Sequence, residues 1–173
     1  KSLLKIALIS KLIKVLILAF VFIPGAFSKD KLSKNKKEII GSIERQKDRL
    51  IEISDKIWEA AETSLQEFKS SKYLSDYAEE NGFTVERGVA DIPTAFTATY
   101  GSGRPYIGIM GEYDANAGIS QKRQPTKETR IKGGAGHGCG HNLFGTASLG
   151  AAIAIKELIE KGEISGTVIF FGT

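Results

Sequence analysis

Residue types that bind metal ions through nitrogen or sulfur are scarce in this chain, which has two histidines and one cysteine among 173 residues. With a single cysteine, the chain cannot form an internal disulfide bond. Basic and aromatic residues are not interleaved as they are on a nucleic-acid-binding surface, so we exclude a nucleic-acid partner. The net charge of +4 does not alter this conclusion, because much of the positive excess lies in the first 37 residues.

The first 28 residues have the three parts of an export signal. Lysines come first, an apolar run from Val15 to Ile23 follows, and the small residues of Ala26–Ser28 come last. We therefore expect a signal peptide over residues 1–28, cleaved after Ser28, and a periplasmic or extracellular protein. The alternative is an uncleaved membrane anchor, although the apolar run is shorter than the ~20 residues that a spanning helix needs. We expect membrane contact only through this segment, if it remains uncleaved.

Residues 29–37 are a charged stretch that we interpret as a linker, and residues 38–173 are expected to form the N-terminal part of one catalytic domain. The chain begins with Lys1 instead of methionine and stops at Thr173 within strand-like sequence. We therefore expect a fragment of a longer protein.

Apolar spacing predicts three helices and four short strands after the linker. The expected helices cover residues 38–58, about 65–80 and 143–160, and the expected strands cover residues 83–87, 94–100, 106–110 and 167–171. Asn81-Gly82 is expected to end the second helix, and Asn142 to cap the third. The polar stretch from Gly111 to Gly134 is too long for an ordinary connection, which favours a functional loop. Strand, loop, helix and strand in this order form a βαβ unit, so the fold class is α/β.

Both histidines and the cysteine lie within the short segment His137–His141, where glycines alternate with them. Imidazole and thiolate are preferred ligands of zinc-like ions, and the glycines allow the backbone to bend until side chains converge. A metal site is the leading interpretation. The alternatives are a glycine-rich turn with a buried thiol, and a thiol hydrolase with Cys139 as nucleophile and a histidine as base. A phosphate cradle is disfavoured because no Gly-Lys-Ser/Thr follows the glycines.

The expected topology places further polar residues beside this cluster. Glu112 and Asp114 follow directly on the strand 106–110, and Cys139 and His141 lie at the start of the next helix. Because ligands of open α/β sheets bind beyond the carboxyl ends of the strands, all four side chains are expected at one sheet edge. Asp114 either binds the metal or orients a histidine that does. Glu112 is a weaker candidate for the metal site than Asp114, since we expect the two acids to point to opposite sides of an extended chain.

Two motifs resemble a known family. Gly136–Thr146, with its cysteine-containing His-x-Cys-Gly-His pattern, and Gly111–Ala115 are similar to amidohydrolases of the aminobenzoyl-glutamate hydrolase type. These belong to the co-catalytic zinc metallopeptidase family, which includes aminoacylases and glutamate carboxypeptidases. The similarity extends from about Ile57 to Thr173. The residues after Asp114 depart from the family pattern, because Ala115-Asn116-Ala117 replaces Ala-Leu-Pro.

The resemblance implies a zinc-peptidase-like three-layer α/β catalytic domain, incomplete in this fragment. It implies two divalent metal ions, zinc or manganese, with Cys139 and His141 as ligands and Asp114 as the acid that follows the strand. The general-base glutamate of the family lies in an adjacent pair beyond residues 167–171, outside this chain. A smaller dimerisation domain, also absent here, implies a homodimer for the full-length protein.

The expected activity is therefore a metal-dependent hydrolase. It would cleave the amide bond of an N-acyl amino acid or a dipeptide-like substrate, such as an aminobenzoyl-glutamate-like molecule, by metal-activated water, and the fragment alone is expected to be inactive. The alternatives are a non-catalytic fragment or metal- or peptide-binding relative, and the thiol hydrolase based on Cys139.

Overall fold

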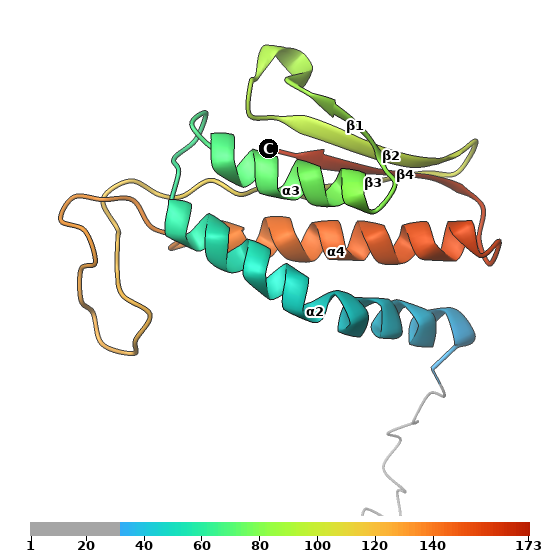
Figure 1. Ribbon diagram of the computed structural model, residues 1–173, viewed down its shortest axis with the longest axis horizontal. Helices are drawn as coiled ribbons and strands as arrows, with labels where there is room; N and C mark the ends of the chain where they lie inside the picture. The colour runs from blue at the N-terminus through green and yellow to red at the C-terminus, as the bar shows by residue number, and fades with distance from the viewer. Residues whose placement is uncertain (1–31) are drawn as a thin grey trace, which may run out of the picture. The chain divides into compact units, whose positions relative to one another are not determined.

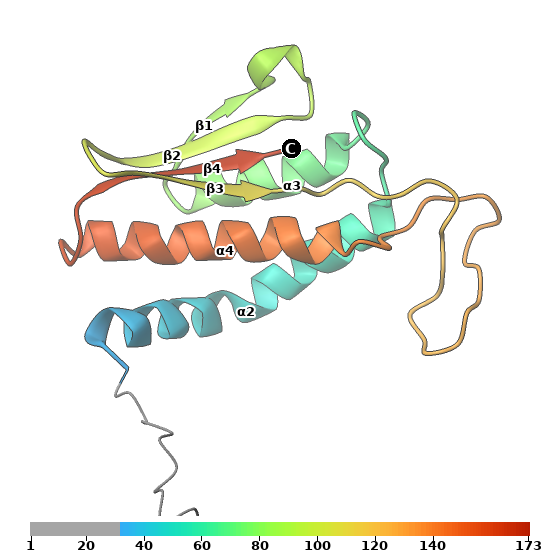
Figure 2. The ribbon, with the colours of Figure 1, turned by 180° about the vertical axis from the view of Figure 1, so that it is seen from behind.

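The computed structural model describes residues 32–173, and the expected signal peptide and the first part of the expected linker lie outside the described residues. Residues 33–173 form one compact unit. A four-stranded sheet has the strand order β1-β2-β4-β3, and α3 and α4 cover one of its faces (Figure 1). Seen from behind, α2 packs along the side of α4 that faces away from the sheet (Figure 2).

The strands confirm the predicted βαβ unit. The strands are β1 (Thr84–Arg87), β2 (Phe96–Ser102), β3 (Tyr106–Gly111) and β4 (Gly166–Gly172), and a short 3-10 helix, η1, covers Val89–Asp91. β3 pairs with β4 in parallel, and α4 (His141–Glu160) connects them. β2 pairs with the other side of β4 and with β1, both in antiparallel orientation. β4 is therefore a central strand, as its apolar sequence predicted.

The helices begin at different residues from those predicted. α2 (Lys34–Ala60) starts four residues before Glu38, because the Ser33 hydroxyl accepts a hydrogen bond from the Lys36 amide at 3.3 Å. The last residues assigned to the linker are thus helical. α3 (Phe68–Glu80) starts after Leu65, whose φ of 66° is incompatible with a helix. α3 ends at Glu80, directly before Asn81, and α4 ends at Glu160, both as predicted.

The core lies between the sheet and its covering helices. On β4, Val168 and Phe170 are buried against the helices, whereas the next residue, Phe171, is 39% exposed on the opposite face. α2 contributes Ile53 and Ile57, both almost completely buried, to the same core. Within residues 32–173 the helices cover only one face of the sheet, so the described part holds two of the layers of the three-layer fold.

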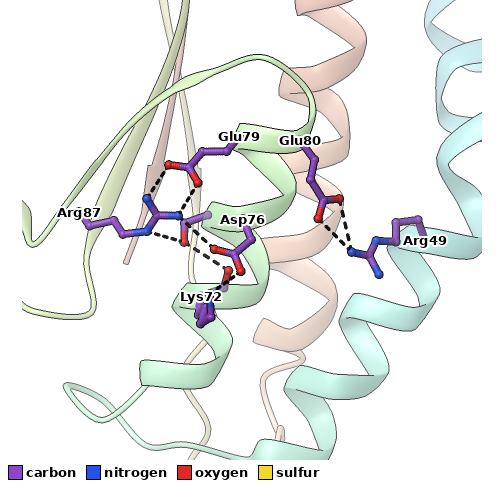
Figure 3. A network of polar contacts seen from close by, with 7 residues as sticks. Arg49, Lys72, Asp76, Glu79, Glu80 and Arg87 are labelled. Carbon is purple, nitrogen blue, oxygen red and sulfur yellow. Dashed lines mark hydrogen bonds and ion pairs between the residues drawn. The ribbon is translucent and has the colours of Figure 1, made fainter.

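Ion pairs join the elements at one end of α3 (Figure 3). Arg87 of β1 contacts Glu79 and Asp76 of α3, with nitrogen–oxygen distances of 2.6 and 3.1 Å. Arg49 of α2 contacts Glu80 of α3 at 3.4 Å. These groups are substantially exposed, so each pair contributes little to stability. These ion pairs connect α3 with α2 and β1, and we do not interpret them as a functional site.

By length and composition, one helix among the described residues could cross a membrane, and this helix is α4. Half of its most apolar window is buried inside the protein, between the sheet and α2. Its apolar character is therefore that of a core helix.

Candidate metal centre

The site is built where β3 ends and α4 begins. After Gly111 the chain leaves the sheet through Glu112, Tyr113 and Asp114. The Tyr113 side chain is fully buried, and its hydroxyl donates a hydrogen bond to the Thr94 carbonyl oxygen. Because alternate residues of an extended chain point to opposite sides, burial of Tyr113 directs both neighbouring carboxylates to the other side.

Both carboxylates therefore reach His141, the first residue of α4. The Asp114 Oδ1 atom lies 2.6 Å from His141 Nδ1, and the Glu112 Oε2 atom lies 3.4 Å from His141 Nε2. The expectation that the two acids diverge was wrong, because positions i and i+2 of a strand share a side. Glu112 thus belongs to the candidate site, on the same side of the chain as Asp114.

Both ring nitrogens of His141 face carboxylate oxygens, with Nδ1 at 2.6 Å from Asp114 and Nε2 at 3.4 Å from Glu112. In the neutral ring the shorter contact favours the proton on Nδ1, which leaves the lone pair on Nε2, beside Glu112. This is how carboxylates orient metal-binding histidines in many proteins. The Asp114 and His141 side chains are each only about a quarter exposed, at 24% and 21%, which holds the pair in place.

Cys139 is not gathered with these groups. Its side chain is exposed, and residues 32–173 contain no group of three or more histidine, cysteine, aspartate or glutamate side chains placed to hold an ion. The donor types fit a divalent ion, with a cysteine and a histidine at the start of α4 and two carboxylates at the end of β3. The expected convergence of all four side chains is therefore only partly confirmed, for Glu112, Asp114 and His141.

Asn142 does not cap α4 as predicted. The residue before the helix is Gly140, whose φ of 76° turns the chain sharply into the first helical turn. Asn142 lies inside the helix and donates a hydrogen bond from its side-chain nitrogen to the Ser54 hydroxyl at 3.0 Å. The side chain thereby ties the start of α4 to α2. Sequence reasoning had no means to find this partner, which lies 88 residues away.

His137 is held by α2. Its Nε2 atom donates a hydrogen bond to the Ile57 carbonyl oxygen at 3.1 Å, and its buried Nδ1 atom has no partner among the described residues. Burial lowers the pKa of the His137 ring, which favours the neutral form. The ring is thus anchored to the scaffold beside the candidate ligands.

The chain is similar to two hydrolases of known sequence. It is 48% identical over 134 residues to one of the subunits of p-aminobenzoyl-glutamate hydrolase from Escherichia coli K12, and the match covers 76% of this chain and 27% of that protein. It is 30% identical over 140 residues to thermostable carboxypeptidase 2 of Saccharolobus solfataricus, covering 78% and 33%. The chain thus spans a third or less of the length of these relatives. No family model matches the chain.

Solved structures share the fold. A Bacillus subtilis protein described as a dinuclear metal-binding peptidase of the M20 family has a TM-score of 0.59 and 27% identity, over 72% of this chain and 34% of that one. A protein described as an aminohydrolase, from methicillin-resistant Staphylococcus aureus, has a TM-score of 0.64 and 24% identity, over 79% and 34%. These findings confirm the resemblance and the α/β fold of M20 peptidase catalytic domains.

Proposed function

We propose that this chain, as a relative of the M20 metallopeptidases and of p-aminobenzoyl-glutamate hydrolase, holds part of the active site of a metal-dependent hydrolase. The reaction would be cleavage of the amide bond of an N-acyl amino acid or dipeptide-like substrate. The observation that carries the proposal is the 2.6 Å contact between Asp114 Oδ1 and His141 Nδ1 at the junction of β3 and α4. The names of the relatives support the reaction class.

The proposal gives each residue a role. Asp114 keeps the proton of His141 on Nδ1, so that Nε2 is directed to the ion. Cys139 and His141 would be ligands, and Glu112 would lie beside the ligand nitrogen. The chemistry that zinc or manganese ions supply in such a site is polarisation of an amide carbonyl and a lowered pKa of a water molecule. Two ions and a homodimer for the full-length protein remain part of the proposal.

The geometry disfavours the thiol hydrolase. A nucleophilic cysteine needs a base within hydrogen-bond reach. Of the two histidines, His141 contacts Asp114 and Glu112, and His137 contacts Ile57. Within residues 32–173 neither ring is hydrogen-bonded to Cys139.

Activity and metal content of the intact protein test the proposal. We expect the variants Cys139→Ala and His141→Ala to lose hydrolysis of p-aminobenzoyl-glutamate and bound metal together, because both side chains are ligands. Glu86→Gln, on exposed β1, is the control and should retain both. Hydrolysis that survives in metal-free protein would favour the thiol mechanism instead. Bound metal without hydrolysis of any N-acyl amino acid would favour a metal- or peptide-binding relative.

Export through the N-terminal signal belongs to the same proposal. It rests on the sequence pattern of residues 1–28. N-terminal sequencing of the mature protein should give Lys29 as the first residue. A mature protein that retains Val15–Ile23 would instead be anchored in the membrane.

A further inference from the structure

Cys139 lies in a tight turn that joins the long loop to α4. The Gly140 amide donates a hydrogen bond to the His137 carbonyl oxygen at 3.3 Å, which closes a four-residue turn with Gly138 and Cys139 at its centre. The Cys139 side chain is exposed instead of packed in the core. The backbone of this turn therefore determines where the thiol lies.

The two ends of the turn are attached to different elements. Gly140 directly precedes α4, and its carbonyl oxygen accepts hydrogen bonds from two amides of the first helical turn, at 2.9 and 3.0 Å. On the other side, Gly136 exchanges two backbone hydrogen bonds with Asn116, at 2.9 and 3.0 Å. Between these two attachments, the first residue of the turn, His137, is held through its side chain.

The C-terminal end of α2 holds the His137 ring. Its Nε2 atom donates a hydrogen bond to the Ile57 carbonyl oxygen at 3.1 Å. This oxygen also accepts the Ala61 amide at 3.0 Å, and it lies near the end of the helix, where partial negative charge favours a donor. The Nδ1 atom is buried and has no partner within residues 32–173, so the bond to Ile57 is the only hydrogen bond of the ring there. A single donor atom thus ties the turn to α2.

The turn has little rigidity of its own. Glycines occupy positions 136, 138 and 140, on both sides of His137 and of Cys139. Glycine has more accessible backbone conformations than other residues, so holding such a segment in one conformation costs entropy. A thiol on this segment needs an external anchor to stay in one place, and the hydrogen bond from His137 to Ile57 is such an anchor.

We propose that His137 is a positioning residue for Cys139. The hydrogen bond to Ile57 fixes the first residue of the turn, and the turn places the thiol at the start of α4. Side chains that orient a ligand contribute to metal affinity without touching the ion. The proposal rests on the proposed function, which assigns Cys139 as a ligand, but His137 holds the turn whether or not an ion is bound.

A spin label on Cys139 tests the positioning directly, because this is the single cysteine of the chain. In the intact protein without metal, we expect the nitroxide to be more mobile in His137→Phe than in the unmodified protein, since phenylalanine keeps a ring but has no donor. His137→Gln should restore the low mobility, because the glutamine amide nitrogen can donate to Ile57 in place of Nε2. Cys139→Ala, treated with the same label, gives the background.

Cobalt measures the effect on the ligand. A thiolate bound to Co²⁺ gives a sulfur-to-metal charge-transfer absorption, which should be present in the unmodified protein and absent in Cys139→Ala. We expect His137→Phe to weaken this absorption and to lower the affinity for Co²⁺ about 10- to 100-fold, as loss of an orienting partner does at other metal sites. His137→Gln should keep both properties close to those of the unmodified protein.

Asn81→Leu is the matched control. The Asn81 side chain also donates to a carbonyl oxygen near the end of a helix, that of Tyr77 in α3 at 2.8 Å, but it is not part of the turn. The variant should leave the label mobility and the cobalt absorption unchanged. If His137→Phe unfolds, His137→Asn takes its place, because the shorter asparagine amide does not reach Ile57.

Three results would overturn the proposal: unchanged label mobility in His137→Phe, equal mobility in His137→Gln and His137→Phe, or equal loosening in Asn81→Leu. The second would show that the ring holds the turn without its hydrogen bond, and the third that the effect is one of general stability. Failure of the proposed function is distinguishable. Without thiolate absorption in the unmodified protein, Cys139 is not a ligand, whereas the label in metal-free protein still reports whether His137 holds the turn.

Discussion

Single residues at the junction of β3 and α4 determine which atoms of the site are free to act. The 2.6 Å contact with Asp114 directs His141 Nε2 outward, and burial of Tyr113 directs the Glu112 and Asp114 carboxylates to the same side. His137, four residues before His141, is instead tied to the Ile57 carbonyl oxygen. Two histidines of one short motif thus have different surroundings, because different elements hold their rings.

Removal of the Asp114 carboxylate should weaken metal binding without unfolding the protein. In Asp114→Ala the ring of His141 loses its orienting acceptor, so we expect the affinity for zinc or manganese to fall about 10- to 100-fold. Isothermal titration calorimetry on the intact protein measures this. Asp48→Ala, which changes an exposed aspartate of α2, is the matched control. An unchanged affinity in Asp114→Ala would mean that this carboxylate does not position the ligand.

At the scale of elements, the close approach of α4 to the end of β3 brings the two halves of the site together. A Cβ atom on Gly145 would lie 2.6 Å from the Glu112 carbonyl oxygen, which is far closer than a real contact. The first turn of α4 can therefore pack against Glu112 only because position 145 has no side chain. The same helix has a second tightly packed glycine, Gly150, whose Cβ would meet the flexible end of Leu50 at 2.9 Å.

These two glycines should respond differently to alanine. Gly145→Ala forces backbone apart, so we expect a loss of about 1–3 kcal/mol in the free energy of unfolding, together with weaker metal binding. In Gly150→Ala the Leu50 side chain can move, and the gain of about 1 kcal/mol in helix propensity offsets the crowding. Urea unfolding of both variants measures the difference. Equal losses would contradict a backbone contact that is specific to Gly145.

For the molecule as a whole, the layers decide which apolar residues stabilise the fold. The helices cover one face of the sheet within residues 32–173, and adjacent residues of β4 therefore have opposite environments. Phe170 is fully buried beside Phe96, with ring centres 5.5 Å apart, whereas Phe171 is 39% exposed on the other face.

Alanine at these two adjacent positions should have unequal costs. We expect Phe170→Ala to lower the free energy of unfolding by about 3–5 kcal/mol, because it leaves a cavity in the core. Phe171→Ala should cost about 1 kcal/mol or less, as is usual for exposed positions. Urea unfolding of the chain measures both values. A large cost at Phe171 would show that other residues cover this face.

Periodic patterns of apolar residues predicted the helices, the strands and the β3–α4–β4 unit, because such patterns depend only on local geometry and burial. The same local reasoning predicted that Asp114 and His141 meet at one sheet edge, since strand and helix are consecutive. It failed at positions where a special backbone conformation overrides the pattern, such as Leu65 and Gly140.

The sequence by itself thus determined the fold class, the order of the elements and the chemical types gathered near the site. Only the tertiary structure decided that Glu112 and Asp114 both contact His141, that Cys139 is exposed, and that α2 anchors His137 and Asn142. The physical reason is that these features depend on contacts between segments far apart in sequence, which packing creates and local patterns do not encode.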